Sequence, residues 1–424
     1  MDMSADQLAS VVTLKTAAPT GTGCIDKVLR ALRTHLGMDV AFVSQFRTTD
    51  RVFVNVDTDG DGPIKPGDCL SLDVGYCLRV VEGVLPELIA DTAHYPVAME
   101  LPETQALPIG SHLSVPIYLS DGRLYGTFCC FGYSADDSLN QRDLLVMKVF
   151  AELIADRIEG DLTQVRDRVA KHRRISAVLA SNQPAIVYQP IFDFHGMAIC
   201  GWECLSRFNV EPLRSPDQWF NEAADAGLGV ELECHAIAAA LRGMDALPSG
   251  TYLTINCSPQ LLLSGRLTEL LGPCPASRLV LEITEHAVVS DYTGLIKALK
   301  PLRQNGVRVA IDDAGAGYAS MRHILQLRPD MIKLDMSLTQ NIDTDPQKRA
   351  MASALIAFAR ETGSTIVAEG VETQSELDAL RLLGANKVQG YLLGRPLALP
   401  DALALVERVA VNSLEEAQPR VTSG

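Results

Sequence analysis

Oxygen-bearing side chains stand near the ends of seven successive apolar runs in the C-terminal part of the sequence. They are Glu203, Asn256, Glu282 with Glu285, Asp312 with Asp313, Asp335, Glu369 with Glu372, and Gln389. So many carboxylates at one edge of a sheet would repel each other unless hard cations lay among them. Oxygen ligands without a histidine cluster favour Mg²⁺ or Mn²⁺ over Zn²⁺. The pattern therefore predicts a divalent-metal site.

The adjacent pair Asp312 and Asp313 closes the apolar run VRVAIDDAG. Neighbouring residues of a strand point to opposite faces, so both can reach one site only if the strand ends there. A solvated turn at the strand end is the local alternative. In the metal interpretation, Asp312 bridges two ions and Asp313 binds only the second. Two ions about 3.5–4 Å apart suit in-line attack on a phosphodiester.

Lys333 and Glu369 complete this predicted chemistry. Lys333 would orient the attacking water or counter developing negative charge, unless it forms only a structural salt bridge with a neighbouring acid. Glu369 is the expected proton acceptor.

Eight short β-rich runs alternate with helical runs after residue 184. The β-rich runs are AIVYQPIF, AICGWECLSRF, TYLTINCS, RLVLEITE, VRVAIDDAG, MIKLDMS, TIVAEGVE and KVQGYLLG. This alternation predicts an α/β fold, a TIM-like (β/α)8 barrel over residues 184–412, with its site at the carboxyl ends of the strands. An open doubly wound sheet is disfavoured because no glycine-rich phosphate fingerprint follows a strand.

Residues 20–158 are predicted to form a separate domain of helices and strands. The segment CIDKVLRALRTHLG has helical spacing. The segment SHLSVPIYLSDGRLYGTFCCFG has the pattern of a hairpin whose tight turn is Asp121-Gly122. Residues 1–19 are interpreted as an N-terminal extension and residues 413–424 as a flexible tail.

A helix is expected to link the two domains over residues 159–183. Apolar residues recur near its start at alternating steps of four and three: Ile158, Leu162, Val165 and Val169. This stripe is typical of a short coiled coil. The helix is therefore either a plain connection or one half of a parallel homodimer that relays a signal.

The bulk composition restricts the location and the partners. A formal net charge of −15 over 424 residues argues against nucleic-acid polymers, although a metal could still bring a small phosphorylated ligand to the site. The N-terminus has no signal-peptide pattern, and no apolar run reaches the roughly 18 residues of a membrane span. The ten cysteines show no disulfide-like spacing. A cytoplasmic protein with reduced thiols is expected.

Seven motifs follow one another over roughly residues 170–410. They are YQPIFDFHGMAICGWECLSRF, INCSPQLL, LEITE, AIDDAGAGYASM, IKLD, AEGVET and QGYLLGRP. Together they resemble the EAL family of cyclic di-GMP phosphodiesterases. The resemblance implies a TIM-like barrel whose first strand runs antiparallel. It also implies hydrolysis of cyclic di-GMP to linear pGpG with Mg²⁺ or Mn²⁺.

The resemblance also implies a role for each matched position. The implied metal ligands are Glu203, Asn256, Glu282 and Asp312 for one ion and Asp313 for a second. The implied catalytic positions are Lys333, which orients the water, Glu369, the general base or a second-metal ligand, and Glu285, which holds the loop after the fifth strand. The implied substrate-binding positions are Gln189, Arg207 and Gln389.

Two motifs depart from the family pattern. Cys204 replaces Ala in the Glu-Ala-Leu triplet. In the loop that usually has the sequence DDFGTGYSSL, Ala314 replaces Phe and Ala316 replaces Thr. The loop thus loses an aromatic anchor and a hydroxyl group. The alternative function is therefore a catalytically weak or inactive receptor that binds cyclic di-GMP and signals through a dimer helix.

Residues 20–158 resemble a GAF domain, most clearly in GSHLSVPIYLSDGRLYGTFCCFG. The resemblance implies an α+β sensory domain, often dimeric, that regulates the phosphodiesterase through a GAF ligand the sequence does not identify. A small-molecule or redox sensor and a purely structural dimerisation role both stay open. Bilin attachment is disfavoured because neither Cys69 nor Cys77 is followed by His.

Overall fold

The chain forms two compact units, Met1–Asp167 and Arg168–Gly424. The computed structural model describes residues 22–272, 274–284, 289, 291–315 and 318–417. Each unit has hydrophobic core clusters of its own, as expected for a chain too long for one ordinary core.

The first unit is built around a six-stranded antiparallel sheet. In spatial order the strands are β3 (Cys69–Ser71), β2 (Asp50–Thr58), β1 (Val40–Phe46), β6 (Leu124–Gly132), β5 (Ser111–Tyr118) and β4 (Leu88–Ile89). The predicted hairpin is formed by β5 and β6. In its turn, Gly122 has a φ of +81°, a left-handed conformation that glycine adopts without steric cost.

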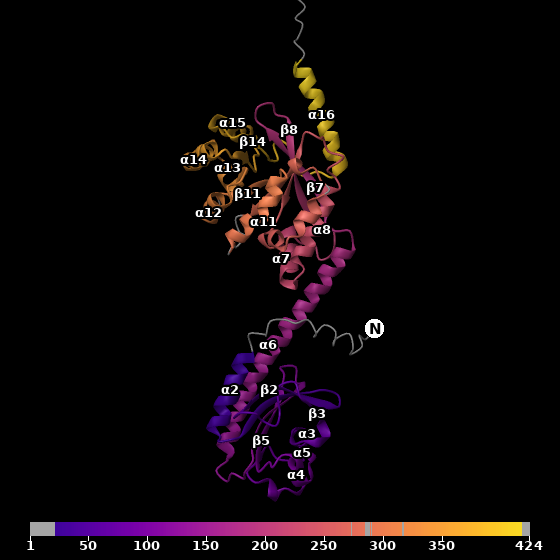
Figure 1. The fold of residues 1–424 in the computed structure, drawn as a ribbon, viewed down its shortest axis with the longest axis vertical. Helices are drawn as coiled ribbons and strands as arrows, with labels where there is room; N and C mark the ends of the chain where they lie inside the picture. The colour runs from indigo at the N-terminus through magenta and orange to yellow at the C-terminus, as the bar shows by residue number, and fades with distance from the viewer. Residues whose placement is uncertain (1–21, 273, 285–288, 290, 316–317, 418–424) are drawn as a thin grey trace, which may run out of the picture. The chain divides into compact units, whose positions relative to one another are not determined.

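Helices cover both faces of this sheet (Figure 1). They are α2 (Thr22–His35), α3 (Tyr76–Val81), α4 (Pro96–Glu100), α5 (Pro102–Ala106) and α6 (Gln141–Ala180), with 3-10 turns at Leu72–Val74 and Thr92–His94. One core lies beneath α2 and the first part of α6, and a second lies beside α3 and α4. Strand alternation separates them, so Cys130 of β6 belongs to the first core and Cys129 to the second.

The second unit is a closed barrel of eight strands. In chain order they are β7 (Ala185–Asp193), β8 (Ile199–Arg207), β9 (Tyr252–Asn256), β10 (Leu279–Thr284), β11 (Arg308–Ala314), β12 (Met331–Leu334), β13 (Thr365–Ala368) and β14 (Lys387–Val388). β7 is antiparallel to its neighbours β8 and β14, whereas the other neighbouring strands are parallel. The predicted barrel and its reversed first strand are both confirmed.

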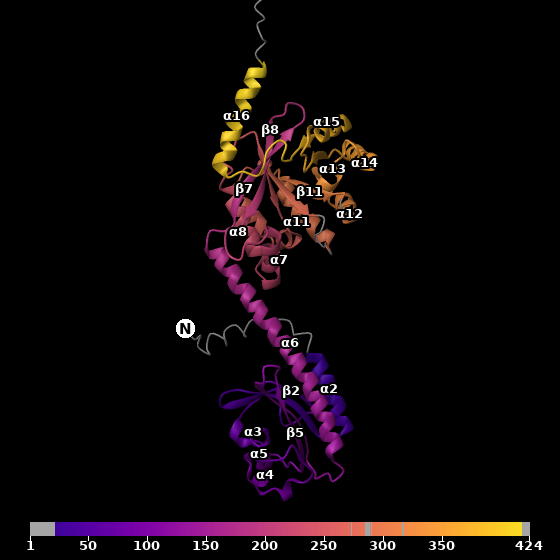
Figure 2. The same cartoon turned by 180° about the vertical axis from the view of Figure 1, so that it is seen from behind.

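Helices connect the barrel strands from β8 onward, and the last helix follows β14 (Figure 2). They are α7 (Pro216–Ala226), α8 (Gly229–Leu241), α9 (Pro259–Ser264), α10 (Arg266–Leu271), α11 (Tyr292–Gln304), α12 (Tyr318–Leu327), α13 (Met336–Thr339), α14 (Pro346–Thr362), α15 (Gln374–Leu383) and α16 (Leu399–Ala417), with a 3-10 turn at Ala276–Arg278. Side-chain caps set several starts, for example the capping box of Thr373 and Glu376 on α15. Among the described helices, none combines the length and the apolar character of a membrane span.

The predicted dimer stripe on α6 is only partly available to another chain. Ile158 is buried and Leu162 packs against the core of the first unit, so these two side chains do not form a seam with a partner helix. Val165 and Val169 are 61% and 43% exposed. A partner helix could therefore use only the second half of the stripe.

Candidate active site

The carboxyl ends of the barrel strands surround a cavity of about 310 Å³. It is lined by Gln189, Glu203, Leu205, Asp312, Asp313, Asp335, Met336, Glu369, Gly370, Glu372, Gln389, Gly390 and Tyr391. Nearly half of these residues carry a carboxylate. A cavity of this composition repels a bare anionic ligand and attracts cations.

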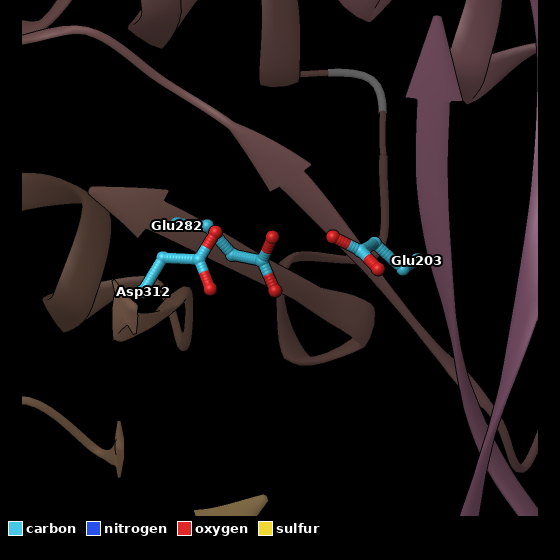
Figure 3. Close-up of side chains that lie close together, drawn as sticks. All are labelled: Glu203, Glu282 and Asp312. Atoms are coloured by element: carbon cyan, nitrogen blue, oxygen red, sulfur yellow. The ribbon is translucent and has the colours of Figure 1, made fainter. Parts of the chain in front are cut away.

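Three carboxylates meet at this end of the barrel in a first acid group, which consists of Glu203, Glu282 and Asp312 (Figure 3). They project from β8, β10 and β11, and one oxygen of each lies within 4.8 Å of the others. The residues are only 8%, 0% and 9% exposed, respectively. Buried like charges at this separation need a cation among them.

Asp312 and Asp313 both line the cavity although they are adjacent on β11. The prediction that the strand ends at this pair is wrong, because β11 continues to Ala314. Instead, the pairing of β11 with β12 shifts between Ile311 and Ala314, and Asp313 has a φ of +57°. This bulge re-aims the side chains and lets neighbours share one face. It creates a second acid group of Asp312, Asp313 and Glu369, with oxygens again within 4.8 Å.

The ammonium group of Lys333 contacts members of both acid groups. Its Nζ atom lies 2.8 Å from Glu369 Oε1, 2.9 Å from Glu282 Oε1, 2.9 Å from Asp312 Oδ1 and 3.2 Å from Glu203 Oε1. Burial alone would lower the pKa of Lys333, but the surrounding carboxylates raise it well above its usual value. Lys333 therefore forms the salt bridge that was considered as its alternative role, and it does so with four acids.

A single ammonium group does not satisfy this cluster. Oε2 of Glu282 is buried and accepts no hydrogen bond from the described part of the chain, while Oε1 of Glu282 and Oδ1 of Asp312 share the single Lys333 ammonium group. Burial raises the pKa of Glu282 to about 8 and raises the pKa of Glu369 well above its usual value. A divalent cation would keep these groups ionised and engage their oxygens. The residues thus fit Mg²⁺ or Mn²⁺.

The two predicted glutamines lie in the cavity wall. Gln389 Nε2 donates a hydrogen bond to Glu203 Oε2, so it orients a carboxylate of the first acid group. Gln189 Nε2 donates to the carbonyl oxygen of Gly394 at 3.1 Å. Because β7 is antiparallel, Gln189 reaches the cavity from the middle of its strand, directly opposite Glu203.

Arg207 does not belong to the cavity lining. It ends β8 on the same face as Glu203 and Leu205, which do line the cavity. Its side chain is half-buried, and Nη1 donates to the carbonyl oxygen of Ser206 at 2.8 Å. Arg207 therefore stands beyond the cavity on the side from which a ligand would approach.

Asn256 is also absent from the cavity lining. It ends β9 beside Glu282 in the strand register, and it is exposed. Its backbone thus lies next to Glu282 of the first acid group. Glu285 and Ala316, which the sequence also singled out, lie outside the described residues.

Two family models match this chain. Residues 172–396 match the EAL domain, and residues 22–159 match the GAF domain. The first match covers more than half of the 424 residues. The chain belongs to the EAL family.

The EAL match agrees with individual relatives. An uncharacterized signaling protein of Caulobacter vibrioides is 31% identical over 311 residues, which are 71% of this chain and 37% of that protein. The probable cyclic di-GMP phosphodiesterase PdeD of Escherichia coli is 31% identical over 244 residues, which are 55% of this chain and 45% of that protein. The chain thus spans less than half the length of these relatives.

A solved structure supports the EAL fold. The EAL enzyme Bd1971, in a form with cAMP and cyclic di-GMP bound, has a TM-score of 0.55 at 18% identity. The match covers 87% of this chain and 93% of that chain. At this identity the likeness concerns the fold alone.

The altered EAL triplet leaves the cavity unchanged. Cys204 follows Glu203 on β8 and points to the opposite side of the strand, into the core outside the barrel. It is 7% exposed, and burial raises the pKa of its thiol well above the usual value. The thiol therefore behaves as a small apolar group there.

Five lining residues of the EAL site were not singled out from the sequence: Leu205, Met336, Gly370, Gly390 and Tyr391. Tyr391 is 49% exposed, and the guanidinium group of Arg395 lies 4.3 Å from its ring centroid. An exposed aromatic face can stack on a flat ligand ring. The sequence offered one signal for Tyr391: it lies two residues after Gln389 in the motif QGYLLGRP, which was already predicted to lie at the barrel mouth.

Proposed function

We propose that this EAL chain hydrolyses cyclic di-GMP to linear pGpG with divalent metal ions at the barrel mouth. The observation that carries this proposal is the pair of acid groups that share Asp312. Two metal ions with a common carboxylate suit phosphodiester hydrolysis. The name of the Escherichia coli relative, a probable cyclic di-GMP phosphodiesterase, supports the same substrate.

The residues that would hold the metal ions fall into two sets. The first ion would be held by Glu203, Asn256, Glu282 and Asp312, and the second by Asp312 and Asp313 with Glu369 beside it. Bound Mg²⁺ or Mn²⁺ would lower the pKa of a water molecule and stabilise negative charge on the phosphate.

The remaining side chains would bind the substrate and move the proton. Glu369 would accept the proton of the attacking water, because it is the acid of the second group that lies apart from the Asp312–Asp313 bulge. Lys333 would offset negative charge as it develops. Arg207 would donate to a phosphate through two parallel N–H groups. Gln189 would contact the ligand from the cavity wall.

The direct test is incubation of the full chain with cyclic di-GMP and Mg²⁺ or Mn²⁺, followed by chromatographic detection of pGpG. Glu203→Gln should lower the rate by about 100-fold or more, because it removes a charged ligand. Glu233→Gln is the matched control, since Glu233 is a half-buried acid of α8 that accepts a hydrogen bond from Ser258 N outside the cavity. The proposal fails if no divalent ion supports turnover.

We also propose that the GAF unit regulates hydrolysis through α6 in a homodimer. The exposed half of the apolar stripe supports this, because Val165 and Val169 lack an apolar covering. The double variant Val165→Glu/Val169→Glu should shift the chain toward a monomer in light scattering and change the rate of hydrolysis. An unchanged mass and rate would contradict this proposal.

The departures in the loop favour a second candidate, a receptor that binds cyclic di-GMP without hydrolysing it. The family pattern has Phe where this chain has Ala314. Ala314 is fully buried, so the packing around this position differs from that expected with a phenyl group. A receptor would bind cyclic di-GMP in calorimetry and yield no pGpG with any divalent ion. Turnover would exclude it.

A further inference from the structure

Two cysteines of the first unit lie against each other inside its core. Cys77 on α3 and Cys129 on β6 have their Sγ atoms 3.5 Å apart, and the residues are 1% and 0% exposed. The sulfur atoms of a disulfide are about 2.05 Å apart, so these two need to approach by only about 1.5 Å. A bond between them would tie α3 to the sheet.

The surroundings of Cys129 are polar, whereas an ordinary buried cysteine packs among apolar side chains. Its Sγ atom lies 3.1 Å from Ser114 Oγ and 3.2 Å from Thr127 Oγ1. These hydroxyl groups come from β5 and β6 and face the same core as the two thiols. They provide hydrogen-bond partners for the Cys129 sulfur atom.

A buried arginine stands next to Cys77. Arg51 is 1% exposed, forms an ion pair with Glu103 at 2.6 Å and donates a hydrogen bond from Nη1 to Cys77 Sγ. Burial opposes ionisation of Cys77, but its hydrogen bond with Cys129 and the charge of Arg51 lower its pKa to about 7. Burial raises the pKa of Cys129 well above its usual value. The pair therefore combines one nucleophilic thiolate with one protonated thiol.

We propose that Cys77 and Cys129 form a dithiol that a peroxide oxidises to a disulfide. The Cys77 thiolate attacks one peroxide oxygen, the O–O bond breaks, and the other oxygen takes up a proton and leaves as water. The Cys77 sulfenic acid is then attacked by the Cys129 sulfur, the S–O bond breaks, and the hydroxyl leaves as water with the Cys129 proton. Two thiols and one hydrogen peroxide thus give one disulfide and two waters.

Two neighbouring cysteines serve as matched controls. Cys130 is as buried as Cys129 but faces the opposite core, and burial raises its pKa to about 12. Cys69 precedes Cys77 along the chain and is exposed on β3. Exposure alone would make Cys69 the oxidised residue, whereas the proposed geometry selects the buried pair.

The test treats the folded full-length protein with hydrogen peroxide and then alkylates the free thiols under denaturing conditions. Peptide mass spectrometry should find Cys77 linked to Cys129, with a loss of two hydrogen masses that dithiothreitol reverses. The linked peptide should disappear in Cys77→Ser and in Cys129→Ser. It should persist in Cys69→Ser and in Cys130→Ser.

Two results would overturn the proposal. One is oxidation confined to exposed thiols such as Cys69, with Cys77 and Cys129 both alkylated. The other is a linked peptide that survives in Cys129→Ser because Cys130 takes its place. The wild-type protein carries the primary measurement, so a variant that fails to fold does not remove the test.

Discussion

The Nζ atom of Lys333 lies 2.8 Å from Oε1 of Glu369, and this contact joins the two acid groups of the barrel mouth. Glu369 belongs to the second group, whereas Asp312, at 2.9 Å from the same Nζ atom, belongs to both. One ammonium group thus binds the carboxylates that are proposed to hold metal ions. The charge of Lys333 and the binding of divalent cations must therefore be coupled.

This coupling can be measured with Lys333→Met. The variant leaves buried carboxylates without their cation and should lower the free energy of unfolding by about 3–5 kcal/mol in the absence of metal. Mn²⁺ should raise its Tm more than that of the wild type. Lys387→Met is the control, because Lys387 is also a strand lysine but lies 3.3 Å from the Tyr252 hydroxyl. Equal Mn²⁺ shifts in both variants would argue against the coupling.

Substitutions of Asp313 can separate the role of its charge from the role of its positive φ in the bulge. Asp313→Asn removes the charge but retains a residue that tolerates a positive φ, so it should lower hydrolysis by about 100-fold with little change in stability. Asp313→Ala should lose hydrolysis equally and also lose about 1–2 kcal/mol of stability. Rate assays and urea unfolding measure the two effects. Equal stabilities of the Asn and Ala variants would show that the positive φ carries no cost.

Gly315 follows this bulge with a φ of +111°, and a Cβ atom placed there would lie 2.2 Å from Leu338 Cδ1. Gly306 has a similar φ of +100°, but its nearest neighbour, Ser277 N, would lie 3.6 Å away. Gly306→Ala should therefore cost about 1–2 kcal/mol for the backbone alone. Gly315→Ala should cost about 1–3 kcal/mol more because of the overlap.

Urea unfolding of the two glycine variants tests this difference. In a Leu338→Ala background, the additional cost of Gly315→Ala should shrink, because the overlapping methyl group is gone. The cost of Gly306→Ala should stay the same in that background. Identical costs at both glycines would contradict a steric role for Leu338.

Glu222 of α7 gives a pH-dependent prediction. Its carboxylate pairs with Arg174 at 2.6 Å and also with Arg214. Burial would raise its pKa, but the two arginines lower it below the usual value. A lowered pKa stabilises the fold above the unfolded-state value of about 4.3, and this contribution is lost as the pH falls through the folded-state value.

Glu222→Gln should therefore flatten the acid side of the stability profile. The Tm of the wild type should fall more steeply than that of the variant when the pH is lowered from neutral into the acid range. Glu269→Gln, at an exposed position of α10, should leave the slope of the wild type unchanged. Parallel profiles for wild type and Glu222→Gln would refute the prediction.

Much of the fold could be predicted because its signals are local. The eight β-rich runs alternate with helical runs in the sequence, and each became a barrel strand. The reversal of β7, in contrast, is not encoded in any local pattern and followed only from the family resemblance. The coiled-coil stripe was predicted to include Ile158 and Leu162, but these two side chains pack on their own unit. Periodicity alone does not distinguish such packing from packing on a partner helix.

The site also has features that could be predicted from the sequence and features that could not. Residue types at strand ends predicted which acids would gather, and five of them form the two acid groups. The bulge that lets Asp312 and Asp313 share the cavity depends on a shifted register and a positive φ, neither of which has a clear sequence signal. The pairing of Cys77 with Cys129 joins positions 52 residues apart and could not be inferred from spacing.

The direction of β7 also decides where the chain enters the barrel. Ala185, the first residue of β7, pairs with Arg207, the last residue of β8, so the polypeptide arrives at the rim where the acid groups lie. In an all-parallel barrel, the first strand would begin at the opposite rim. Only a few residues therefore separate the end of α6 at Ala180 from this rim of the barrel. If the first unit regulates the proposed hydrolysis, its signal would need no path through the barrel, because the chain enters the barrel at the rim where the acid groups lie.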